Sequence, residues 1–110
     1  MTTDVKLAFK TAMALTEAID VEEVDIPKLG ADLTTHGASR FTVPVGACTP
    51  AHSHAPPEVW FIRSGCGILT VDGTGFEVKG GDIVYLQSEK MHAIANVGKS
   101  ELQIFSMWWS

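Results

Sequence analysis

The sequence predicts an all-β domain, either a sandwich or a barrel, because short runs of strand-forming residues alternate with turn signals along most of the chain. The strongest turn signal is Asp72-Gly73, a two-residue hairpin sequence between the strand-like segments 68–71 and 74–78. Gly80-Gly81 marks the next turn, before a strand expected at 82–86. With 110 residues, of which 45% are hydrophobic and 19% charged, the chain suits one globular domain and is too short for two.

Residues 1–30 are predicted to form a short N-terminal arm with edge strands. The stretch 5–19 is ambiguous, because its apolar residues fit one face of a helix and equally fit a short strand. We predict a strand or an irregular arm there. Pro27 has no backbone donor, so it suits an edge strand or the end of one, and Leu29-Gly30 then makes a turn.

Residues 31–110 are predicted to form the barrel, so the chain is a single domain overall. The segment 31–45 is expected to be extended, most clearly at 40–43. His36 lies in this segment beside Gly37, and we expect a partly exposed loop histidine.

The region that follows contains two histidines and a glutamate that can converge. His52 and His54 are two residues apart, so both imidazoles project from one face of an extended strand. Pro56-Pro57 ends that strand, and Glu58 opens a new strand-like run, 58–63. A hairpin can bring Glu58 beside the imidazoles, and this set of side chains suits a transition metal. The alternative is an exposed polar turn with surface histidines, which does not explain the spacing.

The last third of the chain continues the β pattern. Strands are expected at 90–95 and at 101–109, separated by a turn at 96–100. His92 follows Gly81 after ten intervening residues, and Asn96 lies four positions after His92.

Two segments of the chain resemble the conserved motifs of the cupin family. The first cupin motif has a glycine, a His-x-His pair, a glutamate and a second glycine at fixed spacing, and the matching residues are Gly46, His52, His54, Glu58 and Gly65. The second motif is matched by Gly81, His92 and Asn96. Gln87 and Glu89 stand where that motif has proline and glycine, so we expect a differently built turn before His92.

The resemblance implies a double-stranded β-helix, or jelly-roll barrel, that holds one divalent transition metal per chain, namely Fe, Mn, Ni, Zn or Cu. Carried over by position, the metal ligands are His52, His54, Glu58 and His92. Three imidazoles and a carboxylate suit these metals and give no reason to favour Ca or Mg. Six-coordination would leave two positions open, as expected of a chemical rather than a structural site.

Four further residues are candidates for the wall of the cavity. Strand alternation points Trp60 inward with Glu58. Cys48 lies four residues before His52, and we expect a buried, inert thiol there. Ile94 shares the parity of His92. Trp108 is the fourth candidate.

The C-terminal strand ends in two adjacent tryptophans, which alternation places on opposite faces. One of Trp108 and Trp109 is therefore expected to line the cavity, and the other to pack outside or against a second subunit. Val59 and Phe61 face outward on the strand 58–63 and form an apolar stripe, which favours a homodimer.

The first functional hypothesis is a dioxygenase that acts on a small enol, diketone or phenolic substrate. The second is a non-redox isomerase, epimerase, cyclase or lyase that uses the metal as a Lewis acid and Tyr85, Glu89 or His36 as a proton carrier. The third is a non-catalytic module that binds a small molecule, for which Arg40 and Arg63 are the plausible basic residues.

Charge and composition exclude other classes of partner. Thirteen acidic and eight basic residues give a formal net charge of −5, which argues against nucleic acid and anionic membrane surfaces. No apolar run approaches the roughly 20 residues of a membrane span, and the N-terminus lacks the basic start of a signal peptide. We therefore expect a cytoplasmic protein in which Cys48 and Cys66 are free thiols.

Overall fold

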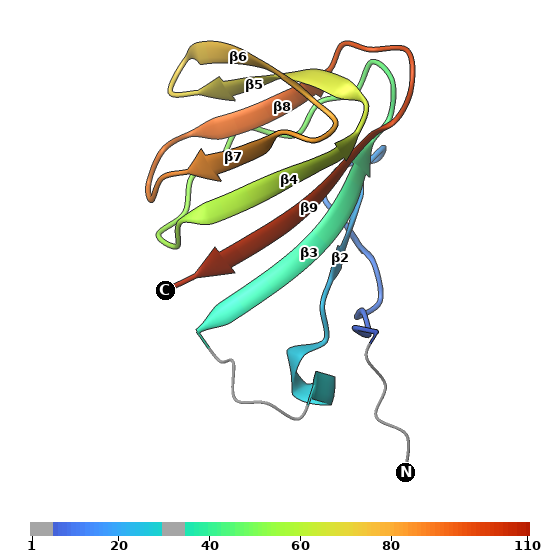
Figure 1. The fold of residues 1–110 in the computed structure, drawn as a ribbon, viewed down its shortest axis with the longest axis vertical. Helices are drawn as coiled ribbons and strands as arrows, with labels where there is room; N and C mark the ends of the chain where they lie inside the picture. The colour runs from blue at the N-terminus through green and yellow to red at the C-terminus, as the bar shows by residue number, and fades with distance from the viewer. Residues whose placement is uncertain (1–5, 30–34) are drawn as a thin grey trace.

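The computed structural model describes residues 6–29 and 35–110, and this part of the chain forms two antiparallel β-sheets (Figure 1). The larger sheet has the strand order β1-β2-β3-β9-β4-β7, and the smaller has the order β6-β5-β8. The strands are β1 (Met13–Ala14), β2 (Asp20–Glu23), β3 (His36–Val43), β4 (Glu58–Ser64), β5 (Cys66–Val71), β6 (Thr74–Lys79), β7 (Ile83–Leu86), β8 (His92–Asn96) and β9 (Leu102–Trp109). The all-β jelly-roll architecture predicted from the sequence is confirmed.

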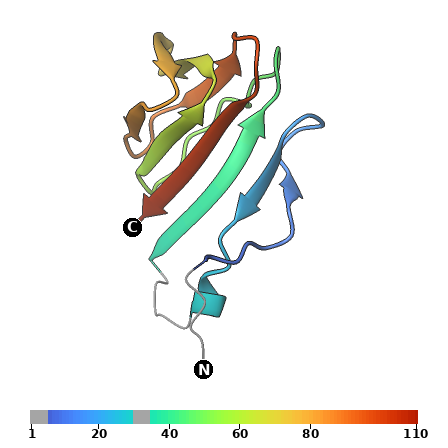
Figure 2. The same cartoon turned by 45° about the vertical axis from the view of Figure 1, so that its right-hand side comes forward.

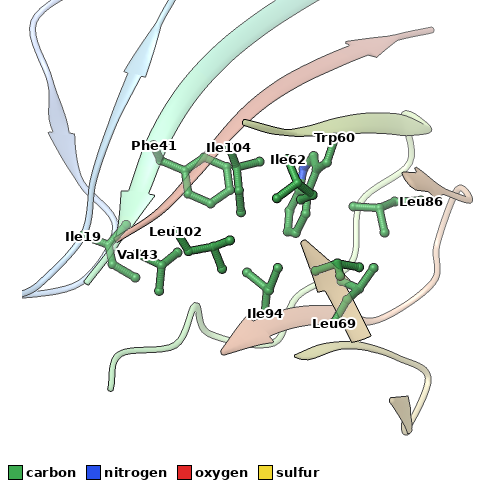
Figure 3. Close-up of a cluster of buried hydrophobic side chains, with 11 residues drawn as sticks. Ile19, Phe41, Val43, Trp60, Ile62, Leu69, Leu86, Ile94, Leu102 and Ile104 are labelled. Atoms are coloured by element: carbon green, nitrogen blue, oxygen red, sulfur yellow. The ribbon is translucent and has the colours of Figure 1, made fainter. Parts of the chain in front are cut away.

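The two sheets pack face to face, and the hydrophobic core lies between them. Figure 3 shows Phe41 and Trp60 pointing from the large sheet toward Ile94 and Leu69 of the small sheet. Strand alternation produces this arrangement, as in β9, where Ile104 is buried and its neighbour Phe105 is exposed. Figure 2 shows β1 and β2 at the side of the large sheet away from the small one, so they extend the sheet beyond the core.

The hairpin predicted at Asp72-Gly73 joins β5 to β6. Both residues have positive φ, 47° and 85°, as a type I′ turn requires. The predicted position of this two-residue hairpin is confirmed.

The described part of the N-terminal arm, residues 6–29, contains short strands joined by irregular segments. Phe9 forms an isolated bridge with Val24, and β1 pairs with β2. Pro27 lies beyond β2, in a 3₁₀ helix (Ile26–Leu29). The predicted boundary between residues 30 and 31 lies outside the described residues. No helix in the described ranges is long and apolar enough to cross a membrane.

The expected loop position of His36 is wrong. His36 is the first residue of β3 and pairs with Trp109 of β9, although it is exposed as expected. Eight residues of β3 pair with β9, so the strand begins at His36. It therefore extends beyond residues 40–43, the part of this segment most clearly predicted to be extended.

Candidate metal centre

Three histidines from two segments converge at one end of the sandwich. His92 begins β8, and its backbone exchanges two hydrogen bonds with the backbone of His52, with N–O distances of 2.9 and 3.1 Å. His54 lies two residues further along, in the loop before β4, and its carbonyl accepts a 2.9 Å hydrogen bond from the backbone N–H of Glu89. One ligand atom from each imidazole lies within 4.8 Å of the others.

Backbone carbonyls fix the orientation of all three imidazoles. The Nδ1 atoms of His52, His54 and His92 lie 3.1, 2.7 and 3.3 Å from the carbonyl oxygens of Pro50, Pro56 and Lys90. Because a carbonyl only accepts, each Nδ1 carries a proton, and each Nε2 presents a lone pair when its ring is neutral. Such an outer hydrogen bond is the usual way in which a protein orients a metal-binding histidine.

Glu58 brings a carboxylate to the same place. It is the first residue of β4 and only 8% exposed, and its Oε1 lies 2.9 Å from His54 Nε2 and 3.7 Å from His92 Nε2. Its other oxygen accepts a hydrogen bond from the buried hydroxyl of Ser106 on β9. The contact with Ser106 therefore turns Oε1 toward the imidazoles.

His92 is the buried member of the group, at 2% exposure. Burial, and next the charge of His52, lower the pKa of the His92 imidazole below its ordinary value, so the neutral form is favoured. Its Nε2 has no hydrogen-bond partner among the described residues. A neutral, buried imidazole nitrogen without a partner has the chemistry of a metal ligand.

The contact between His54 and Glu58 supports the same conclusion. With Nδ1 protonated, the Nε2 lone pair of His54 faces a carboxylate oxygen at 2.9 Å, and two acceptors at that distance repel unless a cation stands between them. A proton or a metal ion can fill that role. Neighbouring ligands about 2.1 Å from one transition-metal ion would lie about 3 Å apart, so the spacing of His54 Nε2 and Glu58 Oε1 fits two neighbouring ligands of the metal implied by the sequence motifs.

A cavity of about 360 Å³ opens beside this group. It is lined by Leu15, Val21, Glu23, Ser39, Phe41, Thr49, His52, His54, Pro56, Glu58, Trp60 and Trp108. The predicted wall residues Trp60 and Trp108 are both present. Trp60 also meets the ring of His92 edge-on, with 5.4 Å between ring centroids.

The other two predicted wall residues do not line the cavity. Ile94 is buried in the hydrophobic core. Cys48 is exposed, so the expected buried thiol is wrong, although both Cys48 and Cys66 are free as predicted. The segment before His52 makes only isolated bridges, at Cys48 and His52, and therefore does not keep the parity of a regular strand.

The two C-terminal tryptophans lie on opposite faces of the sheet. Trp108 walls the cavity, whereas Trp109 stacks on Tyr85, with an angle of 15° between the rings. Trp108 fits closely over Gly37, its partner on β3, because a Cβ at Gly37 would overlap the indole ring. A residue without a side chain is therefore needed at position 37 for Trp108 to reach its place.

This contact predicts the effect of Gly37→Ala. The added methyl group must push the indole of Trp108 away from the cavity, at an expected cost of about 1–3 kcal/mol in the free energy of unfolding. Denaturant unfolding and tryptophan fluorescence measure the two effects. Gly75→Ala is the matched control, because a Cβ there meets only Ile68 at an ordinary 3.5 Å. Unchanged stability and emission in Gly37→Ala would contradict this account of the wall.

The turn before His92 contains a strained residue. Glu89, at the glycine position of the second motif, has φ of 65°, a left-handed conformation that costs an L-residue about 1–2 kcal/mol. The N–H of Glu89 binds the loop that carries His54. Glu89 therefore helps to position a candidate ligand through its backbone, and its side chain does not line the cavity.

Several residues that the sequence suggested for other roles lie away from the histidines. Tyr85 and His36 do not line the cavity, and neither do Arg40 and Arg63, which border a separate groove of about 630 Å³. This groove is larger than the histidine cavity, but none of the three clustered histidines borders it, so we place the chemistry in the smaller one. Sequence reasoning missed Glu23, whose position in the cavity depends on the pairing of β2 with β3.

Comparisons with known proteins agree with this geometry. The family model for the cupin domain matches residues 39–108, more than half of the chain. An uncharacterized protein of Methanocaldococcus jannaschii is 41% identical over 63 residues, which are 56% of this chain and 50% of that protein. A Thermotoga maritima protein named as an oxalate-binding protein is 27% identical over 70 residues, 63% of this chain and 58% of that protein. This chain thus spans about half the length of these two relatives.

The fold is likewise similar to solved structures. A cupin 2 conserved barrel domain protein from Salinispora arenicola has a TM-score of 0.79 and 22% identity, covering 100% of this chain and 91% of that one. The family match covers both histidine segments and the strand that carries Ser106. The chain belongs to the cupin family.

Proposed function

We propose that the chain binds one divalent transition-metal ion through His52, His54, Glu58 and His92. The observation that carries this proposal is the convergence of three oriented imidazoles and one buried carboxylate, three of which, His52, His54 and Glu58, line a cavity. Nitrogen-rich ligation of this kind suits Fe, Mn, Ni, Zn or Cu.

We further propose that the protein is a metal-dependent enzyme. The reaction class that we propose is that of a dioxygenase acting on a small enol, diketone or phenolic substrate. When bound, the metal would hold such a substrate and supply redox or Lewis-acid chemistry. The chain contributes the enclosure: Phe41, Trp60 and Trp108 offer aromatic surfaces to a planar molecule. A cavity of about 360 Å³ accommodates a small ring or a short chelating molecule.

One observation favours the Lewis-acid enzyme as a second candidate. Isomerases and lyases need a proton carrier near the substrate, and Glu23 places a carboxylate in the same cavity as the histidines. Of the three proton carriers suggested by the sequence, none lines this cavity.

The test begins with purified protein reconstituted separately with each of the five metals, followed by elemental analysis. Oxygen uptake by the Fe-loaded protein is then measured in air with catechols, 1,3-diketones and oxalate. Conversion of each substrate is measured both in air and without oxygen. Oxygen consumption that depends on substrate supports the dioxygenase, and equal conversion without oxygen supports the Lewis-acid enzyme. Tight binding with no conversion would identify a binding module, and failure to retain any metal would refute the proposal.

We also propose that the protein is a homodimer formed through an outer apolar face. This face lies on the side of the large sheet away from the core, and its residues are neighbours across β4, β7 and β9. Its members are Val59, Phe61, Ile83, Tyr85, Phe105 and Met107. Exposed apolar side chains that are neighbours on one face of a sheet can be covered by the same face of a second copy across a two-fold axis.

The dimer predicts a clear effect of Phe61→Lys. Phe61 lies opposite both Phe105 and Ile83, so a charge there would be buried without a partner and the dimer should dissociate. Sedimentation velocity measures the change. Phe76→Lys, on the exposed β6, is the control and should remain dimeric. A wild-type protein that sediments as a monomer would refute this interface.

The two free thiols favour a location in a reducing compartment. Cys48 and Cys66 form no disulfide, as is usual in a reducing compartment. We therefore propose that the protein acts in the cytoplasm. Fractionation of cells that express the full-length protein would test this.

A further inference from the structure

A row of polar residues crosses the inner face of the large sheet, beside the apolar core. Glu23 of β2 lies opposite Ser39 of β3, Ser39 lies opposite Ser106 of β9, and Ser106 lies opposite Trp60 of β4. Directly opposed residues in antiparallel strands point to the same side of a sheet. The row therefore leads from the metal centre, at Ser106, to the arm side of the cavity, at Glu23.

The two ends of this row differ in what their side chains contact. The hydroxyl of Ser106 donates to Glu58 and is already engaged. Within the described part of the chain, neither the carboxylate of Glu23 nor the hydroxyl of Ser39 has a side-chain hydrogen bond. Ser39 is only 7% exposed, and both residues line the cavity. Partly buried polar groups without partners in a cavity are unfavourable unless a ligand or water satisfies them.

The charged residues that line the cavity indicate which kinds of ligand it can bind. Neither lysine nor arginine occurs among the described residues that line it. Arg40 of β3, which lies opposite Glu22 of β2, is on the other face of the sheet, where it binds Glu22. Glu23 thus presents a negative charge that no side chain of the lining neutralises, so a second anion would be repelled and a donor or a cation would be attracted.

We propose that Glu23 and Ser39 recognise the end of the substrate that lies away from the metal, and that this end carries a hydroxyl or amino group rather than a carboxylate. The inference rests on the proposed function, because it assumes that the other end of the substrate is held at the metal. The strands β2 and β4 are three strand spacings apart, about 14 Å between their backbones, and the side chains shorten this span.

Two catechols whose short side chains carry opposite charges provide the test. Dopamine and 3,4-dihydroxyphenylacetate share the metal-binding catechol, but one carries an ammonium group and the other a carboxylate. Titration into zinc-loaded protein, which avoids oxidation of the probes, gives a dissociation constant for each. We expect wild-type protein to prefer dopamine by about tenfold or more, the effect of one charge-assisted hydrogen bond. Glu23→Gln should remove most of the preference, and Glu23→Lys should reverse it.

Glu22→Gln is the matched control, because Glu22 is the adjacent residue but binds Arg40 on the outer face. It should leave the preference unchanged. Zinc content is measured for every variant, so loss of metal is distinguished from loss of recognition. Wild-type protein that binds zinc but shows no preference, or Glu23→Gln that keeps the full preference, would overturn this inference and leave the metal site standing. A wild-type protein that binds no zinc would overturn both.

Discussion

Replacing His92 with alanine is expected to remove nearly all of the bound metal. The substitution deletes the buried imidazole whose Nε2 has no partner among the described residues, and leaves His52, His54 and Glu58. Loss of an outer hydrogen-bond partner alone typically weakens metal binding about 10–100-fold, so loss of a ligand should cost more than about 100-fold in affinity. Competition with a chromophoric chelator measures the affinity, and elemental analysis measures the metal content.

The chain offers its own control for this experiment. His36 is exposed at the start of β3 and is not part of the clustered histidines, so His36→Ala should bind metal like the wild type. Circular dichroism establishes that both variants are folded. One metal ion per chain in folded His92→Ala, bound with unchanged affinity, would exclude His92 as a ligand.

Trp60→Ala is expected to cause the largest loss of stability of any substitution considered. Trp60 is 2% exposed, contacts the ring of Phe41 edge-on at 5.5 Å, and lies against His92. Truncation of a tryptophan buried in this way costs about 3–5 kcal/mol of unfolding free energy. Chemical denaturation of the metal-free proteins isolates this effect from metal binding.

Trp60→Phe separates the packing of the ring from its N–H group. The Nε1 of Trp60 is buried without a hydrogen-bond partner in the described structure, and removing an unsatisfied donor offsets part of the lost packing. We therefore expect Trp60→Phe to lose much less stability than Trp60→Ala. Equal losses in the two variants would indicate that the indole N–H, rather than the ring, determines the stability at this position.

The convergence of the three histidines with Glu58 could be predicted because its information is local in the sequence. His52, His54 and Glu58 lie within one hairpin-like segment, and His92 follows the next recognisable turn. Residue parity on β4 similarly placed Trp60 in the cavity, because that strand is regular. Parity failed at Cys48, where the chain makes only single bridges and has no continuous strand.

The remaining parts of the site depend on which strands become neighbours. Ser106 reaches Glu58 because β9 pairs with β4, and Glu23 enters the cavity because β2 pairs with β3. Strand order and register across long loops are not visible in the local pattern of either segment. The same reason hid the contact between Gly37 and Trp108, which joins residues from β3 and β9.

The proposed ligands and one wall of the cavity come from separate stretches of sequence that can change independently. The proposed ligands lie between residues 52 and 92, whereas Leu15, Val21 and Glu23 come from the N-terminal arm and form one wall. Substitutions in the arm can therefore alter which molecules are accepted while the coordinating residues stay the same. Grafting the arm of one family member onto the barrel of another offers a route to new selectivity, and the same separation gives natural sequences a way to diverge in substrate without rebuilding their chemistry.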